Sequence, residues 1–317
     1  MKPYVIGIDL GGTNTVFGLV DRNGKIVCEA SIRTQEYSTA EAFVAKGAEA
    51  MLPLISHAGG TEHVQGIGIG APNANYYNGT IEQAPNLPWK GIVPLAQMFS
   101  DVLGLPVAMT NDANAAAMGE MAYGAARGMK NFIVITLGTG VGSGIVINGQ
   151  LVYGHDGFAG ELGHVTMVRG AEGRLCGCGR KGCLEAYCSA TGVARTAAEI
   201  LENTDRPSSL REKTERITSL DVSLAAAKGD AVAQDIFNFT GRMLGEACAD
   251  FAAFSSPEAF IFFGGLVKAG NLIMQPIQEA YNESVMPIYR GKAKFLVSEL
   301  MDRNAAVLGA SALAWNL

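Results

Sequence analysis

Three cysteines and one histidine are spaced as the ligands of a metal ion would be. Cys176, Cys178 and Cys183 fall within the run LCGCGRKGCLE. His164 shortly precedes that run. Three thiolates and one imidazole form a tetrahedral ligand set that zinc prefers in closed, structural sites. Glycines between the cysteines let the backbone turn tightly enough to bring the sulfurs together. The pattern therefore predicts a structural zinc site made of these four side chains.

Neighbouring cysteines have two other interpretations, buried thiols and a disulfide. The first residues show no basic segment followed by a long apolar stretch and a cleavage site, so we expect no signal peptide and a cytoplasmic location. Thiols stay reduced there, which favours a metal over a disulfide. Cys188 is the one competitor for a ligand position, and it lies outside the tight loop.

Glycine-rich turns after strand-like apolar runs are the next chemical feature. They are Asp9-Leu10-Gly11-Gly12-Thr13, Leu137-Gly138-Thr139-Gly140 and the pair Gly264-Gly265. Successive backbone amides in such turns form anion-binding concavities, to which a threonine hydroxyl adds a donor. The first two turns suit a polyphosphate, the third suits a base or ribose, and Asp9 could hold Mg²⁺ directly or through water. A single glycine pair is more often only a turn.

Other phosphate-binding motifs do not match these turns. The chain has no G-x-x-x-x-G-K-[ST] run, which excludes a P-loop protein. Both of the first two turns lead into a strand-like run, whereas a dinucleotide-binding turn opens a helix.

Carboxylates and amides that suit a polyhydroxyl ligand lie near these motifs. Asp112 follows a short strand-like run and opens an alanine-rich helix beside Asn111, where it suits a general base that orients an attacking hydroxyl. Its alternative role is that of an ordinary helix N-cap. The other candidate sugar ligands are Asn86, Glu161, His164 and Glu185.

An internal repeat indicates how these groups are positioned. Residues 4–27 and 132–152 each show a strand, a glycine-rich turn, a second strand, an Asn-Gly hairpin signal and a third short strand. Chance similarity of two hairpins is the alternative. At 317 residues two lobes are expected, and the repeat predicts related α/β lobes with mixed sheets. We place the lobes at 1–110 plus about 303–317, and at 111–302.

Apolar periodicity and turn residues predict the remaining elements. Helices are expected at 38–56, 92–103, 112–127, 189–203, 230–254, 271–286 and from about 304. Further strands are expected at 63–70, 106–110 and 259–263. Residues 71–91 are expected to form a loop, and residues 204–218 a solvated connection or a lid.

Composition excludes several classes of protein. Hydrophobic residues make up 48% and charged residues 17% of the chain, which is typical of a compact globular protein. No apolar stretch reaches the ~18 residues that span a bilayer, so no membrane partner is expected. The net charge of −6, without a lysine or arginine cluster, disfavours nucleic acid as a partner.

Taken together, the motifs resemble those of the ROK family of sugar kinases and repressors, and most of all its bacterial glucokinases. The matching stretches are IGIDLGGT, APNLPW, TNDANAAAMGE, TLGTGVGSGIVINGQL, GFAGELGHV, CGCGRKGCLE and FFGG. The resemblance implies a two-lobed actin/hexokinase-like (ribonuclease H-like) fold with a cleft between the lobes. It also implies ATP-dependent phosphorylation of a hexose, first of all glucose, at the 6-hydroxyl, with Mg²⁺, structural Zn²⁺ and a homodimer or tetramer.

Site roles follow from the same resemblance. Asp112 would be the catalytic base, and Asn111, Glu161, His164 and Glu185 would hold the sugar hydroxyls. Gly11, Gly12, Thr13, Gly138 and Thr139 would lie along the phosphates, with Gly264 and Gly265 near the adenosine.

One departure from the family pattern leaves the choice of hexose open. The family commonly has Pro-Gly where this chain has Pro72-Asn73, in a loop near the sugar. Mannose, an N-acetylhexosamine, allose and fructose are the alternatives to glucose, and polyphosphate is the alternative donor. A non-catalytic sugar-sensing regulator is the alternative from another class. The phosphate-type strand begins within the first ten residues, so we expect no DNA-binding domain before it.

Overall fold

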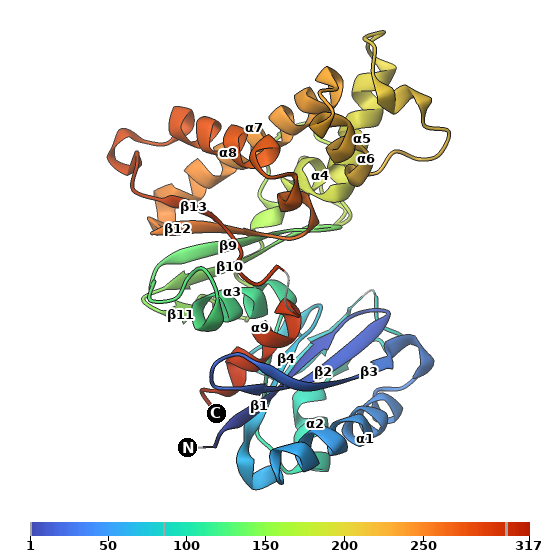
Figure 1. Ribbon diagram of the computed structural model, residues 1–317, viewed down its shortest axis with the longest axis vertical. Helices are drawn as coiled ribbons and strands as arrows, with labels where there is room; N and C mark the ends of the chain where they lie inside the picture. The colour runs from blue at the N-terminus through green and yellow to red at the C-terminus, as the bar shows by residue number, and fades with distance from the viewer. Residues whose placement is uncertain (1, 85, 302–303) are drawn as a thin grey trace. The chain divides into compact units, whose positions relative to one another are not determined.

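The computed structural model describes residues 2–84, 86–301 and 304–317 (Figure 1). Contacts divide the chain into two units. The first comprises Met1–Met129, Gly144–Gly160 and Ser298–Leu317, and the second Lys130–Ser143 and Glu161–Val297. The lobe boundaries expected at 110 and at 302–303 stay a prediction, and residues 302–303 lie outside the described residues.

The first unit is built on a five-stranded mixed sheet of order β3-β2-β1-β4-β8. Its strands are β1 Tyr4–Leu10, β2 Asn14–Asp21, β3 Ile26–Arg33, β4 Val64–Gly70 and β8 Val107–Thr110. Neighbours β1, β2 and β3 pair antiparallel, whereas β4 pairs parallel with both β1 and β8. The carboxyl ends of β1, β4 and β8 therefore lie at one edge, which is where parallel sheets carry their ligand sites.

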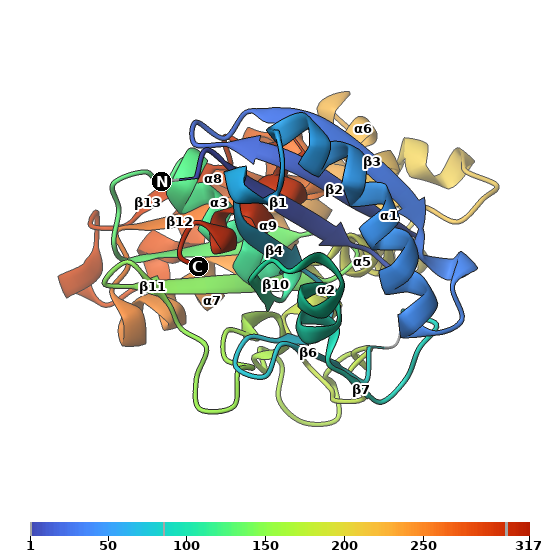
Figure 2. The same cartoon turned by 90° about the horizontal axis from the view of Figure 1, so that it is seen from below.

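The two faces of this sheet are covered by different helices (Figure 2). Helices α1 Ala40–Ala58 and α2 Leu95–Leu103 pack together on one face, over a core that includes Ile6 and Ile8. Helices α9 Ala305–Ala314 and α3 Asp112–Tyr123 cover the other face. Alternation along a strand puts residues 7 and 9 of β1 on the α9 side.

Glycines allow α9 to lie directly on the sheet. A Cβ atom on Gly7 would stand 2.1 Å from the carbonyl oxygen of Val307, and one on Gly68 would stand 1.8 Å from that of Ala310. Any side chain at these positions would push the helix away. The close approach explains why the glycine-rich strand of residues 63–70 carries so many glycines.

The second unit contains most of a sheet that repeats this one. Its five-stranded sheet has the order β11-β10-β9-β12-β13, so both sheets place their strands in the order third, second, first, fourth, fifth. Its strands are β9 Phe132–Leu137, β10 Val141–Ile147, β11 Gln150–Leu151, β12 Ala259–Phe263 and β13 Lys294–Val297. By contacts, residues 144–147 of β10 and all of β11 are grouped with the first unit. The predicted duplication of a mixed sheet that contains hairpins is confirmed.

Helices make up most of the rest of the second unit. They are α4 Glu185–Cys188, α5 Ala190–Glu202, α6 Ser219–Ala227, α7 Ala231–Ser255 and α8 Asn271–Ser284. Helices α7 and α8 pack along one another, and α4, α5 and α6 all contact α7. Residues 204–218 hold a short 3₁₀ helix, Ser209–Glu212, which is tied to α7 by three hydrogen bonds to the Asp230 carboxylate.

Several predicted boundaries are wrong for local physical reasons. The helix expected from residue 92 begins at Leu95, because Ile92–Val93 forms β7, a strand paired with β6 Thr80–Glu82. Strand β6 also pairs with β5 Ala74–Asn75, inside the expected loop. The helix expected to reach residue 127 ends at Tyr123, where the Glu120 carboxylate accepts the Ala125 amide.

Among the described residues no helix has both the length and the apolar composition that a membrane span requires.

Candidate active site

Asp9 is the central polar residue of the first unit. It lies one residue before the end of β1, where it pairs with Val16 of β2 and Gly70 of β4. Burial and the nearby Asp112 carboxylate raise the pKa of Asp9 to about 6. A carboxyl group whose pKa is raised, at the end of a sheet where the parallel strands terminate, is often part of a functional site.

Asp112 begins α3 directly after β8 and is exposed. One of its carboxylate oxygens accepts the Ala113 amide at 2.8 Å. The N-cap of α3 is Asn111, whose Oδ1 accepts the Asn114 amide at 2.7 Å. The alternative of Asp112 as a mere N-cap is therefore wrong, because its neighbour fills that role. The first turn of a helix also favours a negative charge.

The first glycine turn is held by a network of threonines. The Gly11 amide donates to the Asn14 carbonyl at 3.0 Å within the turn itself. Buried Thr34 donates its hydroxyl to the Gly11 carbonyl at 2.8 Å and its amide to the Thr13 carbonyl at 2.9 Å. Thr15 contacts the Thr34 hydroxyl at 2.8 Å. Thr34 thus fixes the carbonyls of Gly11 and Thr13 and so holds the conformation of the turn.

Asn86 lies beside this turn. A Cβ atom on Gly12 would stand 3.0 Å from both the Cβ and the carbonyl oxygen of Asn86. Gln35 donates to the carbonyl of Asn86 at 3.0 Å and also to that of Gly12. The structure thus brings together the two predicted residues, although they are far apart in sequence. Pro85, part of the APNLPW motif, lies outside the described residues.

Asn73, at the departure from the expected Pro-Gly, has a left-handed backbone conformation. Its φ is +51°, in the left-handed region that glycine adopts most easily and asparagine tolerates better than most residues. Its side chain donates to the Glu82 carbonyl at 3.0 Å. Asn73 therefore adopts a backbone conformation that glycine would also adopt, and its amide side chain ties the loop to β6.

The second glycine turn is held by α4 and α5 of the second unit. The Gly138 amide donates to the Gly140 carbonyl, and the Gly138 carbonyl accepts the Ala190 amide at the start of α5. Glu185, the first residue of α4, accepts the Val141 amide at 3.0 Å. Glu185 therefore sits against the turn, and a Cβ atom on Gly140 would stand 2.5 Å from its carboxylate.

Glu161 precedes a one-turn 3₁₀ helix, Leu162–His164, of which His164 is the last residue. The Leu162 amide donates to the Ser143 hydroxyl of β10 at 3.1 Å, which fixes the segment to the sheet. The Glu161 carboxylate lies 3.9 Å from Nε2 of His164. Both side chains are partly exposed, Glu161 at 54% and His164 at 28%.

The four predicted metal ligands converge. One ligand atom from each of His164, Cys176, Cys178 and Cys183 lies within 4.8 Å of the other three. The sulfurs of Cys178 and Cys183 are 3.7 Å apart, and the Cys176 sulfur is 3.7 Å from His164 Nδ1. Tetrahedral zinc, with bonds of about 2.3 Å to sulfur and about 2.0 Å to nitrogen, implies S···S and S···N separations of about 3.8 and 3.5 Å.

The alternatives for these cysteines do not agree with the geometry. A disulfide needs an S–S distance of about 2.05 Å, and all six cysteines are free. Cys188 is fully buried and contacts the Thr240 carbonyl at 3.6 Å, outside the cluster. The donor set and its spacing therefore fit a tetrahedral cation.

Gly264 follows β12 in a conformation that requires glycine. Its φ is +112°, and a Cβ atom there would stand 2.4 Å from the Leu137 carbonyl oxygen. Gly265 then opens a short 3₁₀ helix, Gly265–Ala269. Gly264 thus lies directly against the strand end that leads into Gly138.

Sequence reasoning missed the residues that support these groups. Thr34, Ser143 and Asn114 each hold a candidate site segment through hydrogen bonds. Asn114 is buried, donates to Thr110 at 3.2 Å and leaves its Oδ1 without a partner among the described residues. The sequence offers one signal for Asn114, its position in the TNDAN run. Residues three apart in a helix are neighbours on its surface, which places Asn114 next to Asn111.

Comparisons with known proteins agree with this arrangement. The sequence model of the ROK family matches residues 5–316. A glucokinase of Halalkalibacterium halodurans is 36% identical over 310 residues, covering 96% of this chain and 93% of the relative. A ROK family glucokinase from Streptomyces griseus, solved with glucose and AMPPNP, has a TM-score of 0.77 and 35% identity, covering 99% of this chain and 100% of that one.

A solved ROK family transcriptional regulator, a homologue of the E. coli MLC protein, has a TM-score of 0.85 at 26% identity. It covers 99% of this chain, which in turn covers 78% of the regulator. The architecture is thus shared by kinases and regulators. On the family match and the near-full-length relatives, this chain belongs to the ROK family.

Proposed function

We propose that this protein transfers the γ-phosphoryl group of ATP to the 6-hydroxyl of a hexose, and that glucose is its main substrate. The observation that carries the proposal is a pair of carboxylates, Asp9 near the end of β1 and Asp112 at the start of α3. The two interact beside a glycine turn, in a chain that matches glucokinases over nearly its full length.

In this reaction Asp112 is the general base. It accepts the proton of the hexose hydroxyl as that oxygen bonds to the γ-phosphorus, while the bond from phosphorus to the bridging oxygen of ADP breaks. The hydrogen bond from Ala113 orients the carboxylate. Such catalysis depends mainly on positioning and on electrostatic stabilisation of the charge that develops on the phosphoryl oxygens.

Sugar hydroxyls are bound by a set of carboxylates, amides and one imidazole. We assign this role to Asn86, Asn111, Glu161, His164 and Glu185. Glu185 supports the assignment because one oxygen is fixed by the Val141 amide, which leaves the carboxylate in one orientation. Mannose, allose, fructose and N-acetylhexosamines are the other acceptors to be tested.

Phosphate contacts come from the glycine turns. We assign Gly11, Gly12 and Thr13 and also Gly138 and Thr139 to the phosphates, and Gly264 and Gly265 to the adenosine. Mg²⁺, which ATP-dependent kinases require in general, fits beside Asp9, because a cation there would relieve the repulsion between Asp9 and Asp112. When bound, Mg²⁺ neutralises charge on the polyphosphate.

The four-residue cluster of histidine and cysteines is assigned to structural zinc. Zinc supplies no chemistry here beyond fixing the loop that carries Glu185 and His164. The free cysteines are consistent with a reducing, cytoplasmic location. A homodimer is expected from the family resemblance, and the shared architecture keeps a sugar-binding regulator as the second candidate.

A coupled assay for ADP release tests the proposal. Purified protein is given Mg-ATP and each of glucose, mannose, N-acetylglucosamine, allose and fructose, and the product is identified by mass spectrometry. We expect ADP release with the highest kcat/KM on glucose, and glucose 6-phosphate as the product. Tight glucose binding without formation of any sugar phosphate, with either ATP or polyphosphate as donor, would instead identify a regulator.

A further inference from the structure

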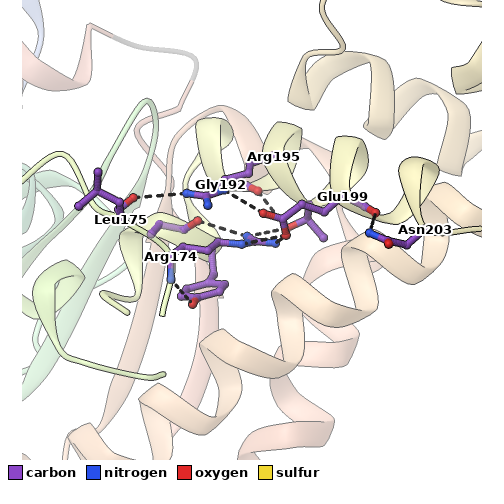
Figure 3. Close-up of polar contacts among 9 residues, drawn as sticks. Arg174, Leu175, Gly192, Arg195, Glu199 and Asn203 are labelled. Atoms are coloured by element: carbon purple, nitrogen blue, oxygen red, sulfur yellow. Dashed lines mark hydrogen bonds and ion pairs between the residues drawn. The ribbon is translucent and has the colours of Figure 1, made fainter. Parts of the chain in front are cut away.

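Arg174 is a buried arginine at the base of the loop that carries the three clustered cysteines. Its exposed fraction is 8%. Its Nε and Nη2 donate to the Glu199 carboxylate of α5 (Figure 3). Its Nη1 donates to the Thr196 hydroxyl at 2.9 Å and to the Ala186 carbonyl of α4 at 3.3 Å. One guanidinium thus joins the loop to both helices.

Aromatic rings hold the same guanidinium from the side. Its carbon lies 4.5 Å from the centre of the Tyr187 ring and 5.8 Å from that of Phe239 in α7. The main chain of Arg174 takes part as well. Its amide donates to the Tyr187 hydroxyl at 2.9 Å, and its carbonyl accepts the Gly182 amide at 2.8 Å. Because the donors point in fixed, planar directions, a lysine could not make the same set of bonds.

Glu199 is shared with a second arginine that reaches the loop. Arg195 donates to the other oxygen of Glu199 at 2.9 Å, and to the Leu175 carbonyl at 3.4 Å (Figure 3). Leu175 forms a β-bridge with Lys181 on the returning side of the loop. The base of the cysteine loop is therefore attached to α5 through both arginines.

The helices that Arg174 holds carry the site groups of the second unit. Helix α4 begins at Glu185, which accepts the Val141 amide and lies 3.4 Å from the Cys176 sulfur. The start of α5 supports the second glycine turn, because Ala190 and Thr191 donate to the carbonyls of Gly138 and Thr139. Arg174 is the point where the metal-binding loop, α4 and α5 meet.

We propose that Arg174 is a positioning residue of the kinase, which sets the orientation of Glu185 relative to the metal-binding loop and to the second glycine turn. The proposal rests on the function proposed above, in which Glu185 binds sugar. Arg174 itself touches neither substrate. Its removal is expected to weaken sugar binding and distort the metal site before it changes the transfer step.

The test compares Arg174→Lys and Arg174→Met with Arg242→Met. Arg242 is an exposed arginine of α7 that pairs with two carboxylates, Glu246 of α7 and Glu283 of α8. Three quantities are measured for each variant: the glucose KM and kcat, the glucose Kd by calorimetry, and the visible absorption spectrum after replacing the loop metal with Co²⁺. The Co²⁺ bands report ligand geometry without any turnover.

We expect both Arg174 variants to raise the glucose KM and Kd at least ~10-fold, with a change of less than ~3-fold in kcat, and to shift the Co²⁺ bands. The Arg242 variant should match the wild type. Folded Arg174 variants with wild-type KM, Kd and Co²⁺ spectrum would overturn the proposal. So would a loss confined to kcat.

A milder variant covers the case in which the Arg174 variants do not fold. Thr196→Val removes one of the Arg174 hydrogen bonds and keeps the volume of the side chain. It should raise the glucose Kd ~2- to 5-fold, and an unchanged Kd would contradict the proposal. If wild-type protein binds Co²⁺ but transfers no phosphate to any hexose, the proposed function fails, and the Co²⁺ spectra still decide the role of Arg174.

Discussion

Replacing Asp9 by Asn should make the ligand-free protein more stable while it abolishes most activity. Burial and Asp112 raise the pKa of Asp9 from 3.8 to about 6, so ionised Asp9 costs folding free energy at neutral pH. A shift of about 2 units corresponds to about 3 kcal/mol at about 1.4 kcal/mol per unit. Asp9 keeps some access to solvent, which screens part of this cost, so we expect a gain of about 1–2 kcal/mol.

The pH dependence of that gain follows from the direction of the shift. The folded pKa lies above the unfolded one, so the cost of Asp9 is complete above pH 6 and disappears as pH falls through about 6 to 4. Urea unfolding at pH 7.5 and pH 4.5 measures it. Asp9→Asn should exceed the wild type in free energy of unfolding at pH 7.5, and the difference should shrink at pH 4.5.

Two comparisons make the measurement decisive. Glu36→Gln changes an exposed carboxylate in the same unit and should alter the free energy of unfolding by less than about 0.5 kcal/mol. The same substitution is then made in a protein that already carries Asp112→Asn. There Asp9→Asn should raise the free energy of unfolding by less, because Asp112, one of the two causes of the raised Asp9 pKa, is no longer charged. An Asp9→Asn protein no more stable than wild type at pH 7.5, or a gain that does not vary with pH, would refute the reasoning.

Three further predictions concern the rest of the site. Asp112→Asn should lower kcat by ~10²-fold or more with little change in the glucose Kd from calorimetry, since the base is lost and the sugar contacts stay. Cys178→Ala should lose the bound metal, measured by elemental analysis, and should raise the glucose KM because the loop is no longer fixed; an unchanged KM in metal-free protein would contradict this coupling. Gly264→Ala should lower the melting temperature and weaken ATP binding more than glucose binding, because its Cβ would meet the Leu137 carbonyl at 2.4 Å in a strained backbone. Equal losses for both ligands would argue against a nucleotide role for Gly264.

Much of the fold could be predicted because local signals and the global architecture agree. Apolar runs that end in glycine turns marked β1 and β9, and the Asn148-Gly149 pair marked the β10–β11 hairpin, where both residues have positive φ. Repetition of one pattern then predicted two sheets of the same design. The convergence of the three cysteines was predictable because short spacing within a glycine-rich loop leaves few other arrangements.

Other features depend on contacts between distant segments, and no local pattern reveals them. Strands β5 and β7 are two residues long, too short for an alternation signal. Thr34 supports the first glycine turn from 23 residues away. Arg174 looks like an ordinary loop cation in the sequence, and its buried bonds to α4 and α5 appear only when the loop is folded.

The most direct test of the central claim is a single-turnover experiment with Mg-ATP and glucose, comparing wild-type protein with Asp112→Asn. Both proteins should bind glucose, and rapid quench followed by mass spectrometry should show glucose 6-phosphate forming ~10²-fold or more slowly in the variant. Equal rates in the two proteins, or no glucose 6-phosphate from the wild type, would contradict the account.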